Sequence, residues 1–171
     1  MQSEELRNLQ APLKEKYREQ PESAVITLKA RGKIGEDISC KVQTGRALIE
    51  AGLHPATGGD GMQACSGDLL LEALVACAGV TLRAVSTAIG VEIKDCVINA
   101  EGDLDFRGTL GVSKEAPVGF KSIRLYFDLD ADATPEQLQT IAKLTERYCV
   151  VYQTISQGVS IATSFNRQGK N

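Results

Sequence analysis

Hydrophobic positions recur along this 171-residue chain with two periods, and the changes of period divide it into helices and strands. Alternation rich in β-branched residues predicts five strands, at 24–34, 37–44, 92–104, 120–131 and 159–165. Spacing near 3.6 predicts three helices, at 1–20, 67–89 and 135–147. The expected order of elements is therefore α-ββ-α-ββ-α-β.

This order predicts an α+β fold in which helices cover one face of a mainly antiparallel sheet. Residues 1–20 form a short amphipathic arm, and residues 21–171 are expected to form one domain. The Gly35-Glu36 turn joins the first two strands as a hairpin. Six Gly and Pro positions within 45–65 predict a long loop.

The helix at 67–89 is the strongest element in the pattern. Ser66 is its expected N-cap, and Gly90 is its expected stop. The polar residues of this helix fall on one narrow stripe that includes Asp68. Cys77 follows Asp68 by nine positions, so it points about 180° away, toward the apolar side of a largely buried helix.

Composition and charge exclude several classes of function. The net charge of −3 and the absence of Trp argue against nucleic acid and against an anionic membrane surface as partners. The acidic first residues carry no secretory signal, and the apolar run Leu69–Leu82 is shorter than the ~20 residues of a membrane span. We therefore expect a cytoplasmic protein whose five cysteines are reduced thiols.

Two of these cysteines lie where a thiol could react. Cys77 is inside the apolar helix, and Cys149 follows the 135–147 helix at the start of another turn, where a helix dipole can stabilise a thiolate. From the residues alone, each could equally be a small apolar residue in a helix contact. Cys40, Cys65 and Cys96 are expected to be structural.

Other chemistry has little support in the sequence. A lone His54 cannot complete a zinc site of standard spacing. Gly58-Gly-Asp-Gly61 lacks the Lys-Ser/Thr of a phosphate loop. We therefore expect no metal and no cofactor.

Three segments together resemble the OsmC/Ohr superfamily, the osmotically inducible and organic hydroperoxide resistance proteins. They are the glycine loop Gly58-Gly-Asp-Gly61, the helix Ser66-Gly-Asp-Leu-Leu-Leu-Glu-Ala-Leu-Val-Ala-Cys77, and Arg147-Tyr-Cys149-Val-Val-Tyr-Gln-Thr-Ile-Ser156 followed by Gly158-Val. The similarity runs from about residue 24 to residue 165.

The resemblance implies an intertwined homodimer in which two long central helices, one from each subunit, pack in the core. It also implies a thiol-dependent peroxidase that reduces organic hydroperoxides and is itself reduced by a dithiol. By this resemblance Cys77 is the peroxidatic thiol and Cys149 the resolving thiol. In the family an Arg and an acidic residue assist the first thiol. Arg31, in preference to Arg46, corresponds best to the Arg, and Asp68 corresponds best to the acidic residue. Val150 follows Cys149 where the family usually has Pro.

Two other functions stay open at this point. An OsmC-like protein with structural cysteines could bind a small apolar ligand in the dimer cleft. A Cys-dependent hydrolase would require His54 beside a thiol.

Overall fold

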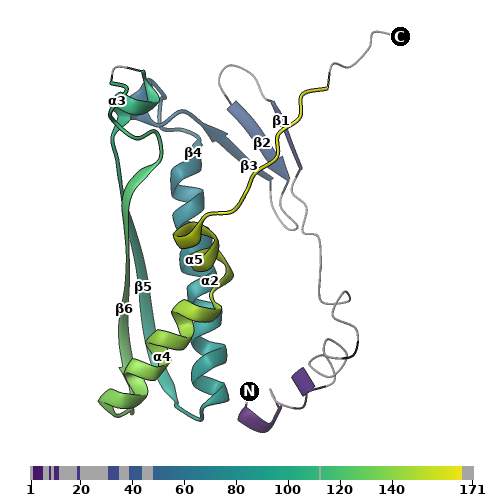
Figure 1. The fold of residues 1–171 in the computed structure, drawn as a ribbon, viewed down its shortest axis with the longest axis vertical. Helices are drawn as coiled ribbons and strands as arrows, with labels where there is room; N and C mark the ends of the chain where they lie inside the picture. The colour runs from purple at the N-terminus through teal and green to yellow at the C-terminus, as the bar shows by residue number, and fades with distance from the viewer. Residues whose placement is uncertain are drawn as a thin grey trace.

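The computed structural model describes residues 48–111 and 113–166 throughout, the backbone of 31–34 and 39–43, and residues 2–5, 8, 10, 11 and 19 of the N-terminal arm. Most of the predicted arm at 1–20 therefore lies outside the described residues. The elements in chain order are β1 Arg31–Ile34, β2 Ser39–Gln43, β3 Leu48–Gly52, η2 Pro55–Thr57, β4 Ala64–Cys65, α2 Ser66–Ala88, β5 Ile93–Leu104, α3 Phe106–Thr109, β6 Phe120–Ala131, α4 Pro135–Tyr148 and α5 Val150–Gln157. The prediction of a mixed fold with antiparallel sheet is confirmed (Figure 1).

The first sheet has the order β1-β2-β3-β4. β1 and β2 pair antiparallel, which confirms the predicted hairpin; residues 24–30 of its first strand lie outside the described residues. The prediction of an unbroken loop over 45–65 is wrong. Leu48–Gly52 forms β3 and pairs antiparallel with β2, and the short β4 pairs parallel with β3. The segment at 48–52 can pair because β2 offers it a free edge, which the glycine count of the segment did not reveal.

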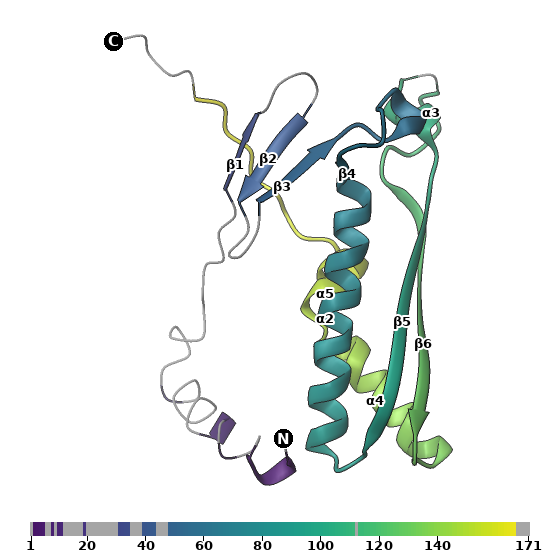
Figure 2. The ribbon, with the colours of Figure 1, turned by 180° about the vertical axis from the view of Figure 1, so that it is seen from behind.

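α2 runs beside the long β5–β6 hairpin, as both ribbon views show (Figure 2). It begins at Ser66, so Cys65 rather than Ser66 is the N-cap residue, and Cys65 makes no capping hydrogen bond through its side chain. Gly90 follows the helix with φ +74°, a left-handed conformation that glycine adopts freely, so the predicted stop is confirmed. By length and composition alone α2 is apolar enough to cross a membrane. This is weak evidence, because the packed core helix of a domain passes the same test.

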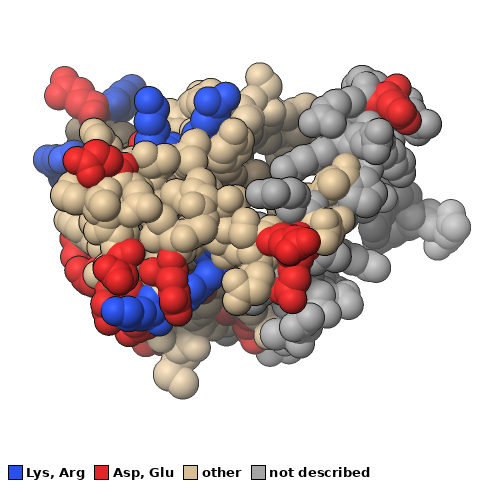
Figure 3. Space-filling view, turned by 90° about the horizontal axis from the view of Figure 1, so that it is seen from below, with Lys and Arg blue, Asp and Glu red and all other residues tan. Residues whose placement is uncertain are grey.

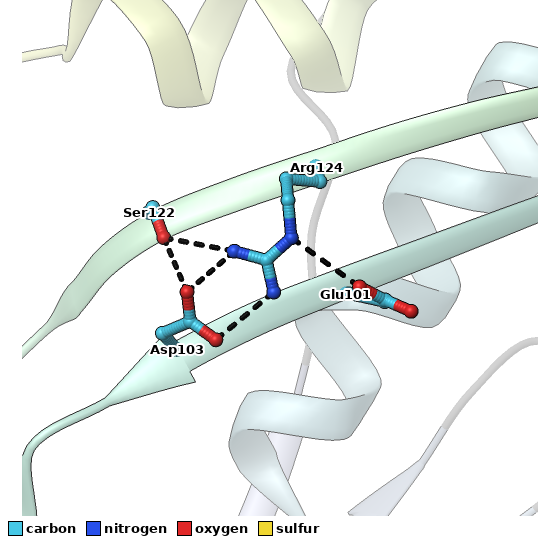
Figure 4. A network of polar contacts seen from close by, with 4 residues as sticks. All are labelled: Glu101, Asp103, Ser122 and Arg124. Carbon is cyan, nitrogen blue, oxygen red and sulfur yellow. Dashed lines mark hydrogen bonds and ion pairs between the residues drawn. The ribbon is translucent and has the colours of Figure 1, made fainter.

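β5 and β6 pair antiparallel over their whole length, with a shift of register between Ile93 and Asp95 where the sequence pattern also loses its phase. The inner face of the pair packs on α2. The outer face carries a polar network centred on Arg124, whose guanidinium contacts Asp103 and Glu101 on the neighbouring strand (Figure 4). Ser122 donates a hydrogen bond of 2.6 Å to Asp103. Because these residues lie directly across the two strands, they favour this register.

α4 crosses the lower part of α2 and leads into α5 (Figure 1). Thr134 and Gln137 form the predicted capping box: the Thr134 hydroxyl accepts from the Gln137 N–H, and the Gln137 side chain accepts from the Thr134 N–H. The predicted strand at 159–165 is wrong, because residues 158–166 have no regular structure. A strand needs a paired edge, and none of the described strands pairs with this segment.

Two hydrophobic clusters hold these elements together. One joins Leu82, Val85 and Ile141 with the start of β5, and the other joins Leu74, Ala78 and Cys149. α2 buries only one face in this chain, so the prediction of a largely buried helix is wrong for the single subunit. On its opposite side Val80 is 74% exposed, and Ala73 and Ala76 are exposed beside it. Viewed from below, the molecule has a broad uncharged surface with acidic and basic side chains around its margin (Figure 3).

Candidate thiol site

The fold brings the two cysteines singled out in the sequence into one cluster. Cys77 lies in the middle of α2 and is half-buried, and Cys149 is only 1% exposed. Both contact the same group of apolar residues, which includes Leu74, Ala78 and Tyr152. The thiol of Cys149 lies within hydrogen-bonding reach of the Cys77 sulfur. The structure therefore places side by side two residues that are 72 positions apart.

A break between two helices positions Cys149. α4 ends at Tyr148 and α5 begins at Val150, so Cys149 caps the end of the first helix and the start of the second. Its backbone is extended there, with φ −72° and ψ 108°. The Cys149 side chain makes no capping hydrogen bond at the start of α5, although the N–H groups of Tyr152 and Val151 lie near enough to lower the pKa of its thiol. The first N–H groups of α5 also act on a second acceptor.

That acceptor is the sulfur of Cys77. Burial by itself raises the pKa of Cys77, because it disfavours the charged thiolate. Hydrogen bonds from the backbone N–H of Val151, the thiol of Cys149, the N–H of Val150 and the hydroxyl of Thr81 act in the opposite direction and outweigh burial. The pKa of Cys77 therefore lies below its ordinary value. The first turn of α5 stabilises the thiolate as a helix N-terminus stabilises any anion.

Thr81 has one proton for two acceptors. Its hydroxyl donates to the carbonyl oxygen of Cys77 at 2.8 Å, and the sulfur of the same residue competes for that proton. The hydroxyl is the weakest of the four groups that favour the thiolate. Of the two N–H groups of α5 that act on Cys77, that of Val151 is also shared, because it acts on the sulfur of Cys149 as well.

Cys149 has the opposite character. Burial raises the pKa of Cys149, and the hydrogen bond that its thiol donates to Cys77 raises it further; the backbone N–H of Tyr152 offsets only part of this. The N–H groups at the start of α5 favour a Cys149 thiolate, as the helix dipole predicts, but burial and the neighbouring Cys77 outweigh them and raise the pKa of Cys149. The same helix start also favours the Cys77 thiolate, and Cys149 is the thiol that keeps its proton. The two thiols are therefore unequal: Cys77 ionises more readily, and Cys149 stays protonated and donates a hydrogen bond to the Cys77 sulfur.

The sequence did not reveal the donors at Val150 and Val151, because backbone groups leave no trace in side-chain patterns. One signal was present, since Val150 follows Cys149 where the related family usually has Pro. Pro has no N–H, whereas Val150 supplies one at the first position of α5. This chain thus has one donor more than a chain with Pro at the same place.

Of the two assisting residues named from the resemblance, Asp68 is not beside the thiols, and the side chain of Arg31 is outside the described residues. Asp68 lies in the first turn of α2, about 13 Å along the helix from Cys77, and lines a shallow hollow with Glu72 and Ala100. Arg31 lies in β1 opposite Gln43, and its side chain is outside the described residues.

The remaining candidate residues do not join the thiol pair. His54 accepts a hydrogen bond from the N–H of Ala56 at 3.0 Å and stacks on Phe106 with ring centroids 4.9 Å apart. Cys65 is at the start of α2, and Cys96 is on β5, where burial raises its pKa. Cys40 lies in β2, where the structure describes only the backbone. Within the described part of the chain, no three His, Cys, Asp or Glu residues are grouped to hold a metal ion.

A cavity of about 720 Å³ borders the cluster between α2, β6, α4 and α5. Its walls are mainly apolar, with side chains from all four elements, and Cys149 forms part of them. The volume is within the usual range for sites that hold small organic molecules.

Comparison with known proteins agrees with this architecture. The family model described as OsmC-like protein matches residues 58–164, which is more than half of the chain and includes both thiols. No curated protein matches the sequence.

Solved structures of the same fold are similar to this one. An OsmC-like protein from Mycoplasma pneumoniae superposes with a TM-score of 0.65 at 17% identity, over 78% of this chain and 89% of the other. An organic hydroperoxide resistance protein from Legionella pneumophila gives 0.61 at 17%, over 77% and 90%. The protein OhrB of Bacillus subtilis gives 0.52 at 21%, over 79% and 93%. The chain belongs to the OsmC-like protein family.

Proposed function

We propose that this protein is a thiol peroxidase that reduces organic hydroperoxides through Cys77 and Cys149. The unequal pair of neighbouring thiols is the observation that supports the proposal most directly. The nucleophile of such a reaction has to be a thiolate, and its partner has to supply a thiol that traps the oxidised product. Some relatives with this fold are described as organic hydroperoxide resistance proteins, which agrees with the same chemistry.

The reaction proceeds in two steps on the protein. The Cys77 thiolate attacks the distal oxygen of the hydroperoxide, the O–O bond breaks, and the alkoxide leaves and takes up a proton as the alcohol. Cys77 is then a sulfenic acid. The Cys149 thiol attacks the sulfenic sulfur, the S–O bond breaks, and a disulfide and water form. A dithiol that is oxidised to its own disulfide returns both cysteines to the reduced state.

The surroundings of the pair favour an organic substrate. Cys77 contacts Leu74, Ala78 and other apolar side chains, and no ionised side chain is among the groups that shift its pKa. An alkyl or aryl group gains free energy on leaving water for such a site, at about 25 cal/mol per Å². Hydrogen peroxide has no such group, so organic hydroperoxides are expected to react faster.

The proposal includes a cytoplasmic homodimer. In the single chain the strip formed by Ala73, Ala76 and Val80 on α2 is open to solvent, and Cys77 lies at its edge. The C-terminal segment also exposes Ile161 by 86% and Phe165 by 94%. Packing of two α2 strips would give the two long central helices of an intertwined dimer. It would also give Asp68, which lies about 13 Å along α2 from Cys77, a route to Cys77 from the facing subunit.

Turnover of t-butyl hydroperoxide with dithiothreitol as the reductant tests this function. Wild-type protein should consume hydroperoxide catalytically, and Cys77→Ser should abolish consumption. In a separate reaction without dithiothreitol, Cys149→Ser should react once at Cys77 and then accumulate sulfinic acid with a second equivalent of hydroperoxide, because no thiol traps the sulfenic acid. Cys96→Ser, a half-buried thiol outside the pair, is the matched control and should retain turnover. Wild-type protein that consumes no hydroperoxide would contradict the proposal.

A further inference from the structure

The break between α4 and α5 frees the backbone N–H groups that act on Cys77. In an unbroken α-helix the N–H of Val150 would donate to the carbonyl oxygen of Glu146, four residues earlier. The N–H of Val151 would donate to the carbonyl oxygen of Arg147 in the same way. Neither of these two backbone bonds is formed in the described part of the chain, and both N–H groups act on the sulfur of Cys77 instead. The thiolate therefore depends on whatever stabilises the break.

Nothing in the covalent chain forces the helix to stop at this point. Val150 is not proline, so it keeps the N–H that would continue the helix. The interruption is confined to Cys149, whose φ of −72° suits a helix and whose ψ of 108° does not. The N–H of Cys149 still donates to the Thr145 carbonyl oxygen at 2.9 Å, and its own carbonyl oxygen accepts from the Gln153 N–H at 2.9 Å. Rotation of one ψ angle would thus join the two helices and consume the free N–H groups.

The side chain of Gln153 makes the hydrogen bond that the break leaves open. Its amide nitrogen, Nε2, donates to the carbonyl oxygen of Glu146 at 2.8 Å. This oxygen is the acceptor that the Val150 N–H would have in an unbroken helix. The other end of the same amide is also bound, because Gln153 Oε1 accepts a hydrogen bond from the side-chain amide of Gln157, one turn later. The amide is therefore held with its donor toward α4.

From this exchange of partners we propose that Gln153 is a positioning residue for Cys77. Its amide occupies the Glu146 carbonyl oxygen, so the Val150 N–H is left for the sulfur and is not drawn back into the helix. Gln153 is not among the groups that shift the pKa of Cys77, so it acts through the backbone of α5. The inference deepens the proposed function, on which its consequence for peroxide reduction rests.

The exchange is favourable because it gives each of two acceptors a donor. Without the Gln153 amide, the carbonyl oxygen of Glu146 and the sulfur of Cys77 would compete for the single N–H of Val150. With the amide in place, the carbonyl oxygen and the sulfur each have their own donor. A hydrogen bond to an ionised group contributes more than a neutral one, so it is the thiolate that gains most from the release of the N–H.

Removing the donor while keeping the length of the side chain tests this role. Gln153→Met has a similar length, no hydrogen-bond donor and a good helix propensity, so the variant should fold. Thr154→Val is the matched control, because it exchanges a polar for an apolar side chain of similar size at an exposed position of the same helix. The pH dependence of Cys77 alkylation by iodoacetamide is measured for both variants, with peptide mapping.

In Gln153→Met the midpoint of Cys77 alkylation should move to higher pH. At a pH below the midpoint, the rate should fall about threefold or more relative to Thr154→Val, because the loss of one neutral hydrogen bond is enough for such a factor. Thr154→Val should titrate as the wild-type protein does. Equal pH profiles for the two variants would overturn the inference.

The substitution Val150→Pro separates positioning from a general effect on the fold. It interrupts the helix covalently and removes the N–H for which the Glu146 carbonyl oxygen would compete. In that background Gln153→Met should shift the alkylation profile no further, whereas a further shift of the same size would overturn the inference. Alkylation requires no hydroperoxide, so a wild-type protein without turnover would contradict the proposed function and leave the role of Gln153 standing.

Discussion

Replacing Val150 by proline should raise the pKa of Cys77 and slow alkylation of its thiol about tenfold. Val150 is the first residue of α5, and its N–H is one of the donors that favour the Cys77 thiolate. Proline removes that N–H and fits the first position of a helix, where the donor has no partner within the helix. Proline also requires an extended residue before it, and Cys149 already has ψ 108°. The substitution therefore deletes one hydrogen bond with little other change.

The size of the effect follows from the hydrogen bond that is lost. A hydrogen bond to a charged group contributes about 1.5–3 kcal/mol, and one pKa unit corresponds to about 1.4 kcal/mol. Four donors share the sulfur of Cys77, and the Val150 N–H stabilises the thiolate less than the Val151 N–H does. We therefore expect the lost hydrogen bond to contribute a free energy at the lower end of this range. At a pH below the pKa, the thiolate fraction and the rate of alkylation should both fall about tenfold.

The assay is the pH dependence of Cys77 alkylation by iodoacetamide, followed by peptide mapping. Val150→Ala is the control, because it removes the side chain, which is 69% exposed, and keeps the N–H. The alanine variant should titrate as wild type does, below the ~8.5 of an ordinary thiol. If the proline variant folds with α5 intact and titrates as the alanine variant does, the α5 N-terminus does not stabilise the thiolate and the reasoning is refuted.

Three further predictions concern the assembly and the fold. Val80→Arg places a charge in the exposed strip of α2, so the variant should be a monomer in analytical ultracentrifugation where the wild-type protein is a dimer. A wild-type protein that is already monomeric would contradict the proposed assembly. Thr134→Ala removes half of the capping box of α4 and should lower the free energy of unfolding by about 1 kcal/mol in urea titrations. An unchanged midpoint would mean that the cap is not formed in solution. Arg124→Ala breaks an exposed network on the outer face of the sheet, so turnover should equal that of wild type, and a large loss of activity would show that this face contributes to the site.

The regular elements were predictable because their side chains carry a clear period. The helix from Ser66, the β5–β6 pair and the capping box at Thr134 all follow from local pattern and local chemistry. β3 was missed because it is only five residues long and lies among the glycines of the segment, which hide the short pattern that pairs with β2. The strand expected at 159–165 was wrong because an alternating pattern gives a tendency to pair and does not supply the partner.

The two thiols of the site were also predictable, but their relation was not. A motif can name Cys77 and Cys149, whereas their proximity depends on the packing of α5 against α2. The direction of each pKa depends on backbone N–H groups and on burial, which appear only once the chain is folded. The break between α4 and α5 places the start of α5 beside both sulfurs, and the balance of burial and hydrogen bonds lowers the pKa of Cys77 and raises that of Cys149.

The proposed redox cycle is tested most directly by the thiol state after one equivalent of t-butyl hydroperoxide. The protein is quenched within seconds, its intact mass is measured, and its disulfides are mapped with and without subsequent dithiothreitol. The account predicts a loss of two hydrogens, one disulfide between Cys77 and Cys149, and full reversal by the dithiol. Unreacted thiols, or slow oxidation spread over all five cysteines, would contradict it.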